Sequence, residues 1–196
     1  MLNIYPLPLG DYETNCYIVS EDGSKKCVVI DPGYDAYLIE EKLTELDLEC
    51  EAILLTHGHF DHVGAVRDLV ATAGCPVYLR QEELSMPPQM TAGPLYYTDF
   101  YPTEGQLTVA GLDFTVLHTP GHTPGSVCIL VDDALFSGDT LFAGSCGRTD
   151  FPGGDARQMS GSLRRLKELP DHLNVYPGHG RSSTIAWEKK HNFYFR

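Results

Sequence analysis

The stretch that most constrains this chain is a loop that holds three histidines and one carboxylate within six positions. An apolar run with strand character leads into Thr56-His57-Gly58-His59-Phe60-Asp61-His62. In an extended chain His57 and His59 project to the same side, and Asp61 keeps that alternation. His62 breaks it where a helical pattern begins. Imidazole and carboxylate suit zinc, iron and manganese, so the loop predicts a metal site, and its turn from strand to helix suits two metals.

Length and charge limit the class of protein. The chain has 196 residues, which favours one domain, 1–196, with a sizeable core. The formal net charge of −13 makes nucleic acid and anionic membrane surfaces poor partners. Neither a signal peptide nor a membrane span is visible, and the six cysteines form no C-x-x-C pair. We therefore expect a cytoplasmic protein with reduced thiols, and the sequence leaves its oligomeric state open.

Strands and helices alternate along the chain, which predicts an α/β fold. Strands are expected at 2–9, 14–20, 27–30, 51–56, 76–79, 107–109, 112–117, 127–131, 134–137 and 175–176. Helices are expected at 35–47, at 62–73, after Asp155 and from about 183. The irregular segment 86–104 is rich in proline and aromatic residues, including Tyr96 and Tyr97. It either walls a substrate pocket or is a loop held to its own core by those rings.

Further ligand-type residues fall at the ends of these expected strands. Three segments carry them: Thr119-Pro120-Gly121-His122-Thr123-Pro124-Gly125-Ser126, Ser137-Gly138-Asp139-Thr140 and Pro177-Gly178-His179-Gly180. Together with the 56–62 loop they resemble, in identity and order, the metallo-β-lactamase superfamily and within it the glyoxalase II-like hydrolases. The resemblance spans nearly the whole chain. It implies an αββα sandwich of two mixed β-sheets with helices on the outer faces and metals at one edge.

The resemblance also implies a role for each ligand-type residue. His57, His59 and His122 would hold one divalent ion, and Asp61, His62 and His179 a second. Asp139 would bridge the two ions. Asp31 and His118 would orient the ligand loops, because a coordinating imidazole needs its other nitrogen fixed, although a purely structural hydrogen bond fits His118 equally well. Zinc is the first candidate for both ions, and iron and manganese suit the same donors.

Such a centre would activate water for attack on a small-molecule acyl thioester such as S-D-lactoylglutathione. A thiol leaves as thiolate without a strong general acid, and Asp61 would accept a hydrogen bond from the attacking water. Arg148 resembles the basic residue that grips a glutathione carboxylate, although a pair with Asp150 or Asp155 fits its spacing as well. The sequence lacks the C-terminal helical extension of full-length glyoxalase II enzymes, so a broader thioesterase is expected.

A second hypothesis is an oxidoreductase of the same superfamily. The segment Gly147-Arg148-Thr149-Asp150-Phe151 also resembles the persulfide dioxygenases, in which His57, His122 and Asp139 would hold a single iron. The intact Pro177-Gly178-His179-Gly180 segment argues for a second metal site and therefore for the hydrolase. A non-catalytic metal-binding protein is a third class, and no ligand position is replaced in a way that favours it.

Overall fold

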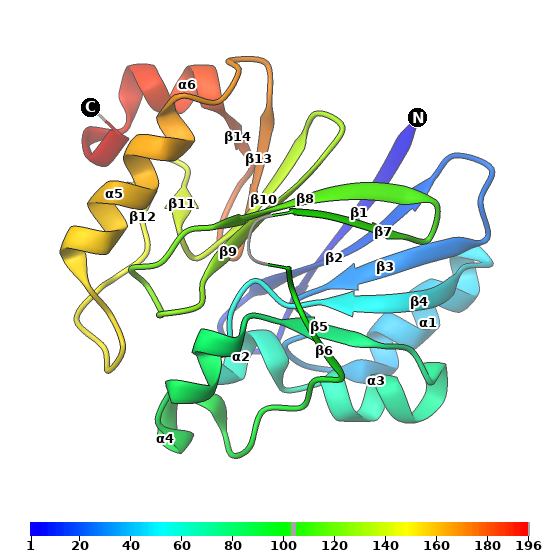
Figure 1. Cartoon of the computed structure of the whole chain (residues 1–196). Helices are drawn as coiled ribbons and strands as arrows, with labels where there is room; N and C mark the ends of the chain where they lie inside the picture. Colours follow the sequence, from blue (N-terminus) through cyan, green and yellow to red (C-terminus); the bar gives the residue numbers. More distant parts are fainter. Residues whose placement is uncertain (103–104, 196) are drawn as a thin grey trace.

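Two β-sheets lie face to face in the computed structural model, which describes residues 1–102 and 105–195 (Figure 1). The first sheet has the order β1-β2-β3-β4-β5-β6, with β1 Leu2–Leu9, β2 Thr14–Glu21, β3 Lys26–Ile30, β4 Glu49–Leu54, β5 Val77–Leu79 and β6 Asp99–Phe100. The second has the order β14-β13-β10-β9-β8-β7, with β14 Ser183–Thr184, β13 Asn174–Pro177, β10 Ala134–Gly138, β9 Val127–Val131, β8 Leu112–His118 and β7 Gly105–Val109. Both sheets are mixed, since β3 runs parallel to β4 and β10 runs parallel to β13.

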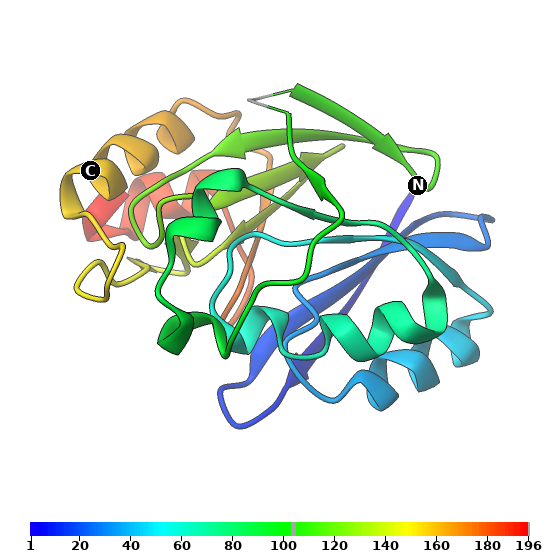
Figure 2. The ribbon, with the colours of Figure 1, turned by 60° about the horizontal axis from the view of Figure 1, so that its bottom comes forward.

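Helices cover the outer faces of both sheets, as two views of the ribbon show (Figures 1 and 2). The helices are α1 Ala36–Leu46, α2 Phe60–Val63, α3 Val66–Ala73, α4 Pro88–Thr91, α5 Ala156–Lys167 and α6 Ile185–His191, with the 3₁₀ turns η1 Gln81–Ser85 and η2 Phe193–Phe195. The helices α1 and α3 pack on the first sheet, and α5 packs on the second with α6 beside it. This arrangement confirms the expected αββα sandwich. In the described part of the chain, no helix is long and apolar enough to cross a membrane.

The strand residues alternate between two apolar layers, as a period of two requires. In β3, Val28 and Ile30 face the layer between the sheets, whereas Val29 faces the layer under α1 and α3. In β10, Phe136 faces the layer between the sheets and Leu135 faces α5. Both central strands are therefore buried on both faces. Asp31 directly follows β3, and Asp139 directly follows β10.

The expected helix at 62–73 is wrong in one respect, because the structure divides it into α2 and α3 at Gly64 and Ala65. The loop after β3 packs against this point. The Ala65 amide donates to the Pro32 carbonyl at 3.0 Å. A Cβ atom on Gly64 would lie 2.3 Å from the Gly33 carbonyl oxygen. The break therefore lets the β3 loop approach the residues that precede α3.

Three smaller differences come from local pairing. Segment 86–104 is not wholly irregular, since it contains α4 and β6, and residues 103 and 104 lie outside the described part. The glycine-rich segment after Asp139 contains a short hairpin of β11 Leu141–Phe142 and β12 Ser145–Cys146. The last helix begins at Ile185 rather than 183, because Ser183 and Thr184 pair with β13 and Thr184 then caps α6.

Candidate metal centre

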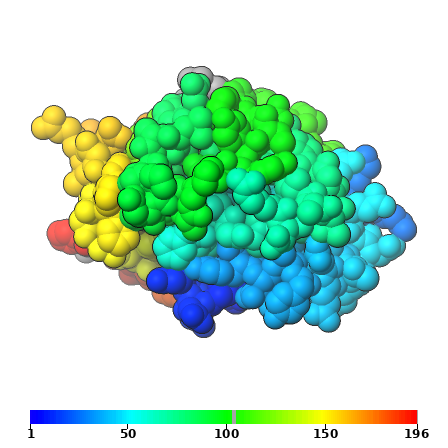
Figure 3. All heavy atoms as spheres, turned by 90° about the horizontal axis from the view of Figure 1, so that it is seen from below, coloured from blue at the N-terminus to red at the C-terminus, as the bar shows by residue number. Residues whose placement is uncertain are grey.

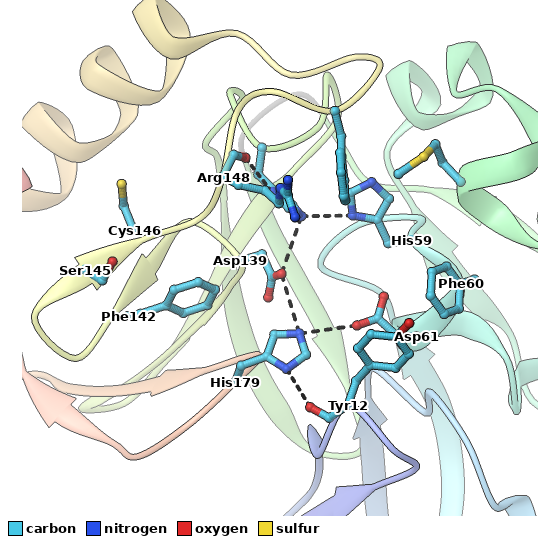
Figure 4. A pocket seen from close by; sticks show the side chains of 13 residues that line it. Tyr12, His59, Phe60, Asp61, Asp139, Phe142, Ser145, Cys146, Arg148 and His179 are labelled. Carbon is cyan, nitrogen blue, oxygen red and sulfur yellow. Dashed lines mark hydrogen bonds and ion pairs between the residues drawn. The ribbon is translucent and has the colours of Figure 1, made fainter.

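Loops from both sheets meet at one edge of the sandwich. His57 and His59 follow β4, and His122 lies in the loop between β8 and β9. Asp139 follows β10, and His179 follows β13. The sequence places these residues at strand ends, and the structure brings them together at this edge. His59, His122, Asp139 and His179 line one cavity there (Figure 4).

The first group of potential ligands consists of His57, His59 and His122. One nitrogen from each ring lies within 4.8 Å of the others. The closest approach is 2.8 Å, between His59 Nδ1 and His122 Nε2. All three side chains are buried. Three neutral imidazoles in such an arrangement form a ligand set that suits a divalent transition metal.

The second group consists of Asp61, His62 and His179. Its ligand atoms also lie within 4.8 Å of one another. His179 Nε2 lies 3.2 Å from Asp61 Oδ2, and His62 Nε2 lies 3.7 Å from the same oxygen. Asp61 and His62 come from the first turn of α2, so the turn that follows His59 directs them toward a different point from His57 and His59.

Asp139 lies between the two groups. Its Oδ2 is 3.4 Å from His122 Nε2 of the first group and 3.6 Å from His179 Nε2 of the second, and its Oδ1 is 3.4 Å from His62 Nε2. Gly178 passes close by, since a Cβ atom there would lie 2.3 Å from Asp139 Oδ1. The absence of a side chain at Gly178 therefore permits this approach, and Asp139 is placed to serve both groups.

The outer nitrogens of four rings have partners that fix which nitrogen faces the cluster. The pairs are His57 Nδ1 with Thr56 Oγ1 at 3.1 Å, His62 Nδ1 with Asp31 Oδ2 at 2.9 Å, His122 Nδ1 with the Arg148 carbonyl at 2.8 Å and His179 Nδ1 with the Tyr12 carbonyl at 3.2 Å. Asp31 also accepts from the Thr56 amide at 2.7 Å and from the Thr56 hydroxyl at 2.5 Å. Asp31 thus occupies the orienting position expected for it.

The surroundings favour neutral rings at His57 and His59 and charged forms of His62 and Asp139. Burial lowers the pKa of His57, and burial and the nearby His122 lower the pKa of His59 to about 4. Burial opposes the charge on His62, but Asp139 and Asp31 outweigh it and raise its pKa. Burial would likewise raise the pKa of Asp139, and the charge of His62 outweighs it and lowers that pKa. The carboxylate is therefore ionised, as a ligand must be.

The donor set fits a divalent metal. His57 Nε2, His62 Nε2 and Asp139 Oδ1 are buried without a hydrogen-bond partner in the described residues. A buried polar atom without a partner is costly, and a coordinated cation would satisfy it. A third set of close atoms joins Asp31 to His57 and His62, but the Asp31 oxygens already accept hydrogen bonds from Thr56.

A cavity of about 650 Å³ opens beside the cluster. Its wall is largely apolar and aromatic, and it includes Tyr12, Phe60, Met90, Phe142, Cys146, Arg148 and Phe151. Met90 of the expected 86–104 segment and Phe151 both belong to this wall. Figure 3 shows the green segment around residue 90 beside the yellow segment around residue 150. Segment 86–104 therefore contributes to this wall through Met90.

The three expected substrate residues differ in position. Arg148 lines the cavity, but its guanidinium forms a fork with Asp150 at 2.8 Å and lies 3.6 Å from the centre of the Phe151 ring. Tyr96 and Tyr97 are not part of the cavity wall. Tyr96 packs under Arg67, and Tyr97 stacks on the Phe100 ring. A substrate contact by either tyrosine stays a prediction.

His118 contacts its own loop. Among the described residues it forms no hydrogen bond with a ring of the cluster, and its Nε2 lies 2.9 Å from the Pro124 carbonyl oxygen. It therefore stabilises the loop that carries His122.

Sequence reasoning missed Glu83, a fully buried glutamate. Its two oxygens contact the loop that carries His57 and His59 and the loop that carries His122. Its polar neighbours gave no sign of burial.

A two-sheet sandwich with a histidine–aspartate cluster at one edge defines a class of metal-binding proteins. The sequence model of the metallo-beta-lactamase superfamily matches residues 9–179, and the chain belongs to that superfamily. The chain is 36% identical to the hydroxyacylglutathione hydrolase GloC of Haemophilus influenzae, over 97% of each chain.

Solved structures agree with this assignment. The BLEG-1 B3 metallo-beta-lactamase superposes with a TM-score of 0.89 at 38% identity, covering 100% of this chain and 99% of that one. TTHA1623 in a di-iron-bound form gives 0.84 at 37%, covering 97% and 99%. ETHE1 from Myxococcus xanthus gives 0.84 at 32%, covering 97% and 83%.

Proposed function

We propose that this chain is a dinuclear metal-dependent hydrolase that cleaves small-molecule acyl thioesters such as S-D-lactoylglutathione. The single observation that carries the proposal is the position of Asp139 between two ligand groups that face one cavity. The similarity to GloC, named as a hydroxyacylglutathione hydrolase, supports the thioester as the substrate class. We extend the proposal to a cytoplasmic enzyme, which the six free cysteines support.

One ion would be held by the first group, which is His57, His59 and His122. The other ion would be held by the second group, which is Asp61, His62 and His179, and Asp139 would be a ligand of both ions. When bound, two divalent ions lower the pKa of a shared water and polarise the substrate carbonyl. Zinc is our first choice for both ions. Iron is the second candidate, because the similar protein TTHA1623 was solved in a di-iron-bound form. The chemistry of the ligands themselves does not separate zinc from iron or manganese.

The chain's own residues supply orientation and proton handling. Asp61 Oδ2 accepts a hydrogen bond from Thr14 Oγ1 at 3.2 Å, which holds the carboxylate toward the cavity. We assign to Asp61 the catalytic role of accepting a hydrogen bond from the attacking water. The apolar side chains of Phe142, Phe151 and Met90 offer an acyl group a contact surface in the cavity. A thiolate leaving group needs no general acid from this wall.

Metal quantification combined with a substrate panel tests the proposal. The metal-replete protein should bind two ions per chain and should hydrolyse S-D-lactoylglutathione or another acyl thioester faster than a lactone, a phosphodiester or a β-lactam. The β-lactam belongs in the panel because of the similarity to the BLEG-1 enzyme. Two bound ions with no thioester turnover would contradict the substrate class, and failure to bind metal would contradict the centre itself.

The similarity to ETHE1 favours keeping a second candidate, the mononuclear iron persulfide dioxygenase. In that case His57, His122 and Asp139 would hold one iron. The presence of His179 beside Asp61 and His62 supports the dinuclear hydrolase instead. One iron per chain with O₂ uptake that depends on a persulfide substrate would favour the dioxygenase.

A further inference from the structure

Glu83 is a buried carboxylate that none of the expected catalytic roles uses. It lies in the 3₁₀ turn η1, its side chain has no solvent exposure, and its two oxygens point in different directions. Oε2 accepts a hydrogen bond from the Gly58 amide at 2.6 Å, and Oε1 accepts one from the Gly125 amide at 2.6 Å. Hydrogen bonds to a carboxylate are short and strong when both partners are held in place.

The two amides belong to the two loops that supply the first ligand group. Gly58 lies between His57 and His59, and Gly125 lies three residues after His122. The loops come from different sheets, so the distance between their ligands depends on contacts across the edge of the sandwich. A second link, from the Val127 amide to the Thr56 carbonyl at 2.9 Å, joins the loops at their base. Glu83 joins the two loops at Gly58 and Gly125, nearer to the histidines.

Both contacts depend on glycine. A Cβ atom on Gly58 would lie 3.0 Å from Glu83 Oε2, and one on Gly125 would lie 2.8 Å from Glu83 Cγ and 2.9 Å from its amide nitrogen. Either side chain would displace the carboxylate or its backbone. The fit between one buried glutamate and two glycines therefore explains why these two loop positions carry no side chain in this chain.

From these contacts we propose that Glu83 is a positioning residue that sets the separation of His57 and His59 from His122. The inference rests on the metal centre proposed above, and Glu83 itself touches neither metal nor substrate. A ligand set held at the spacing a metal requires binds without reorganising its loops. Loss of an outer contact of this kind costs about 10–100-fold in metal affinity.

The test compares Glu83→Gln with Glu82→Gln. The amide of the first variant keeps one acceptor oxygen and places an NH₂ group against the other loop amide, so one loop loses its bond. Glu82 is the neighbouring carboxylate and pairs with Arg80 outside the two loops, which makes it a matched control. Competition of Zn²⁺ against a chromophoric chelator should show two ions for the wild type and for Glu82→Gln. In Glu83→Gln one of the two should bind about 10–100-fold more weakly.

Amide exchange in the metal-free protein gives a second readout, which does not depend on metal binding. The Gly58 and Gly125 amide protons should be strongly protected, and Glu83→Gln should abolish the protection of at least one while circular dichroism stays native. Equal zinc affinity in a folded Glu83→Gln protein, or fast exchange of both glycine amides in the wild type, would overturn the inference. If the wild type binds no metal, the proposed centre fails, and the exchange data alone then decide whether Glu83 joins the loops.

Discussion

His62 Nδ1 lies 2.9 Å from Asp31 Oδ2, and both side chains are buried. Asp31 directly follows β3 and lies in the left-handed region, with φ of 50°, a conformation that aspartate and asparagine tolerate better than most residues. The same carboxylate accepts two hydrogen bonds from Thr56, which precedes His57. One side chain from the neighbouring strand therefore fixes the start of the ligand loop and the ring of His62.

Asp31→Asn tests this relationship with little change in backbone preference. The Asn amide donates where the carboxylate accepted, so His62 would present Nδ1 as acceptor and carry its proton on Nε2, which faces Asp139 and Asp61. Affinity for the ion of the second group should fall about 10–100-fold. Chelator competition measures the affinity, and imidazole NMR spectra of the metal-free protein report whether His62 Nδ1 carries a proton. A proton retained on Nδ1 together with unchanged affinity would refute the role of Asp31.

Asp139→Ala tests the carboxylate between the groups. Because its oxygens face both groups, the variant should lose at least one of the two ions and should lose thioester turnover by several orders of magnitude. Metal analysis after dialysis measures the first effect, and steady-state kinetics measures the second. Asp113→Ala, an exposed residue of β8, is the control and should retain both ions. A full metal content in Asp139→Ala would rule out the bridging position.

The residues that the structure brings together in this cluster could be singled out from the sequence because their segments carry local signals. An apolar strand followed by His57 and His59, or by Asp139, marks the end of a buried strand, and strand ends meet at a sheet edge. The α/β class follows from the alternation of strands and helices along the chain. The αββα sandwich came from the family resemblance, and the structure then showed that Val28 and Val29 face two different apolar layers. Family resemblance supplied the grouping of the ligands, which spacing alone left open.

The remaining features had no such signal. The partner of His122 Nδ1 is the Arg148 backbone carbonyl, and any residue type offers a carbonyl. The break between α2 and α3 depends on a carbonyl of Pro32 that is distant in sequence. Glu83 lies in a polar turn beside Gln81 and Glu82, and only the tertiary packing buries it.

The Arg148–Asp150 pair leads to a prediction about substrate charge. In the wild type the fork with Asp150 and the stack on Phe151 occupy the guanidinium at the cavity wall. Asp150→Asn should release it and should lower KM for a thioester that carries carboxylates, such as S-D-lactoylglutathione, by up to about fivefold, the range of exposed ion pairs. A neutral acyl thioester should show no change. Steady-state kinetics at low and high salt measures the effect, which salt should reduce.

Asp171→Asn is the matched control, because Asp171 forms an exposed pair with Lys189 at 2.6 Å and is not part of the cavity wall. It should leave KM for both substrates unchanged. If Asp150→Asn instead raised KM for the carboxylate substrate, the ion pair would be holding Arg148 in its binding position, and the guanidinium would bind substrate while paired.

Buried thiols predict a loss of stability in alkali. Burial raises the pKa of Cys128 from its ordinary value of 9.0 to about 11. Between these values the unfolded chain has released the thiol proton and the folded chain retains it, so stability falls as pH rises. Cys128 should contribute a loss of about 2 kcal/mol by pH 11. Burial also raises the pKa of Cys16 and Tyr17, which adds to the slope.

Urea unfolding at pH 7, 8, 9, 10 and 11 measures this slope, with Cys128→Ser as the comparison. Serine does not ionise in this range, so the variant should lose less stability than the wild type above about pH 9. At pH 7 and 8 the thiol is largely protonated in both states, so the difference between the two proteins should be constant there. Parallel curves for both proteins up to pH 11 would show that the Cys128 thiol ionises as readily in the folded chain as in the unfolded one.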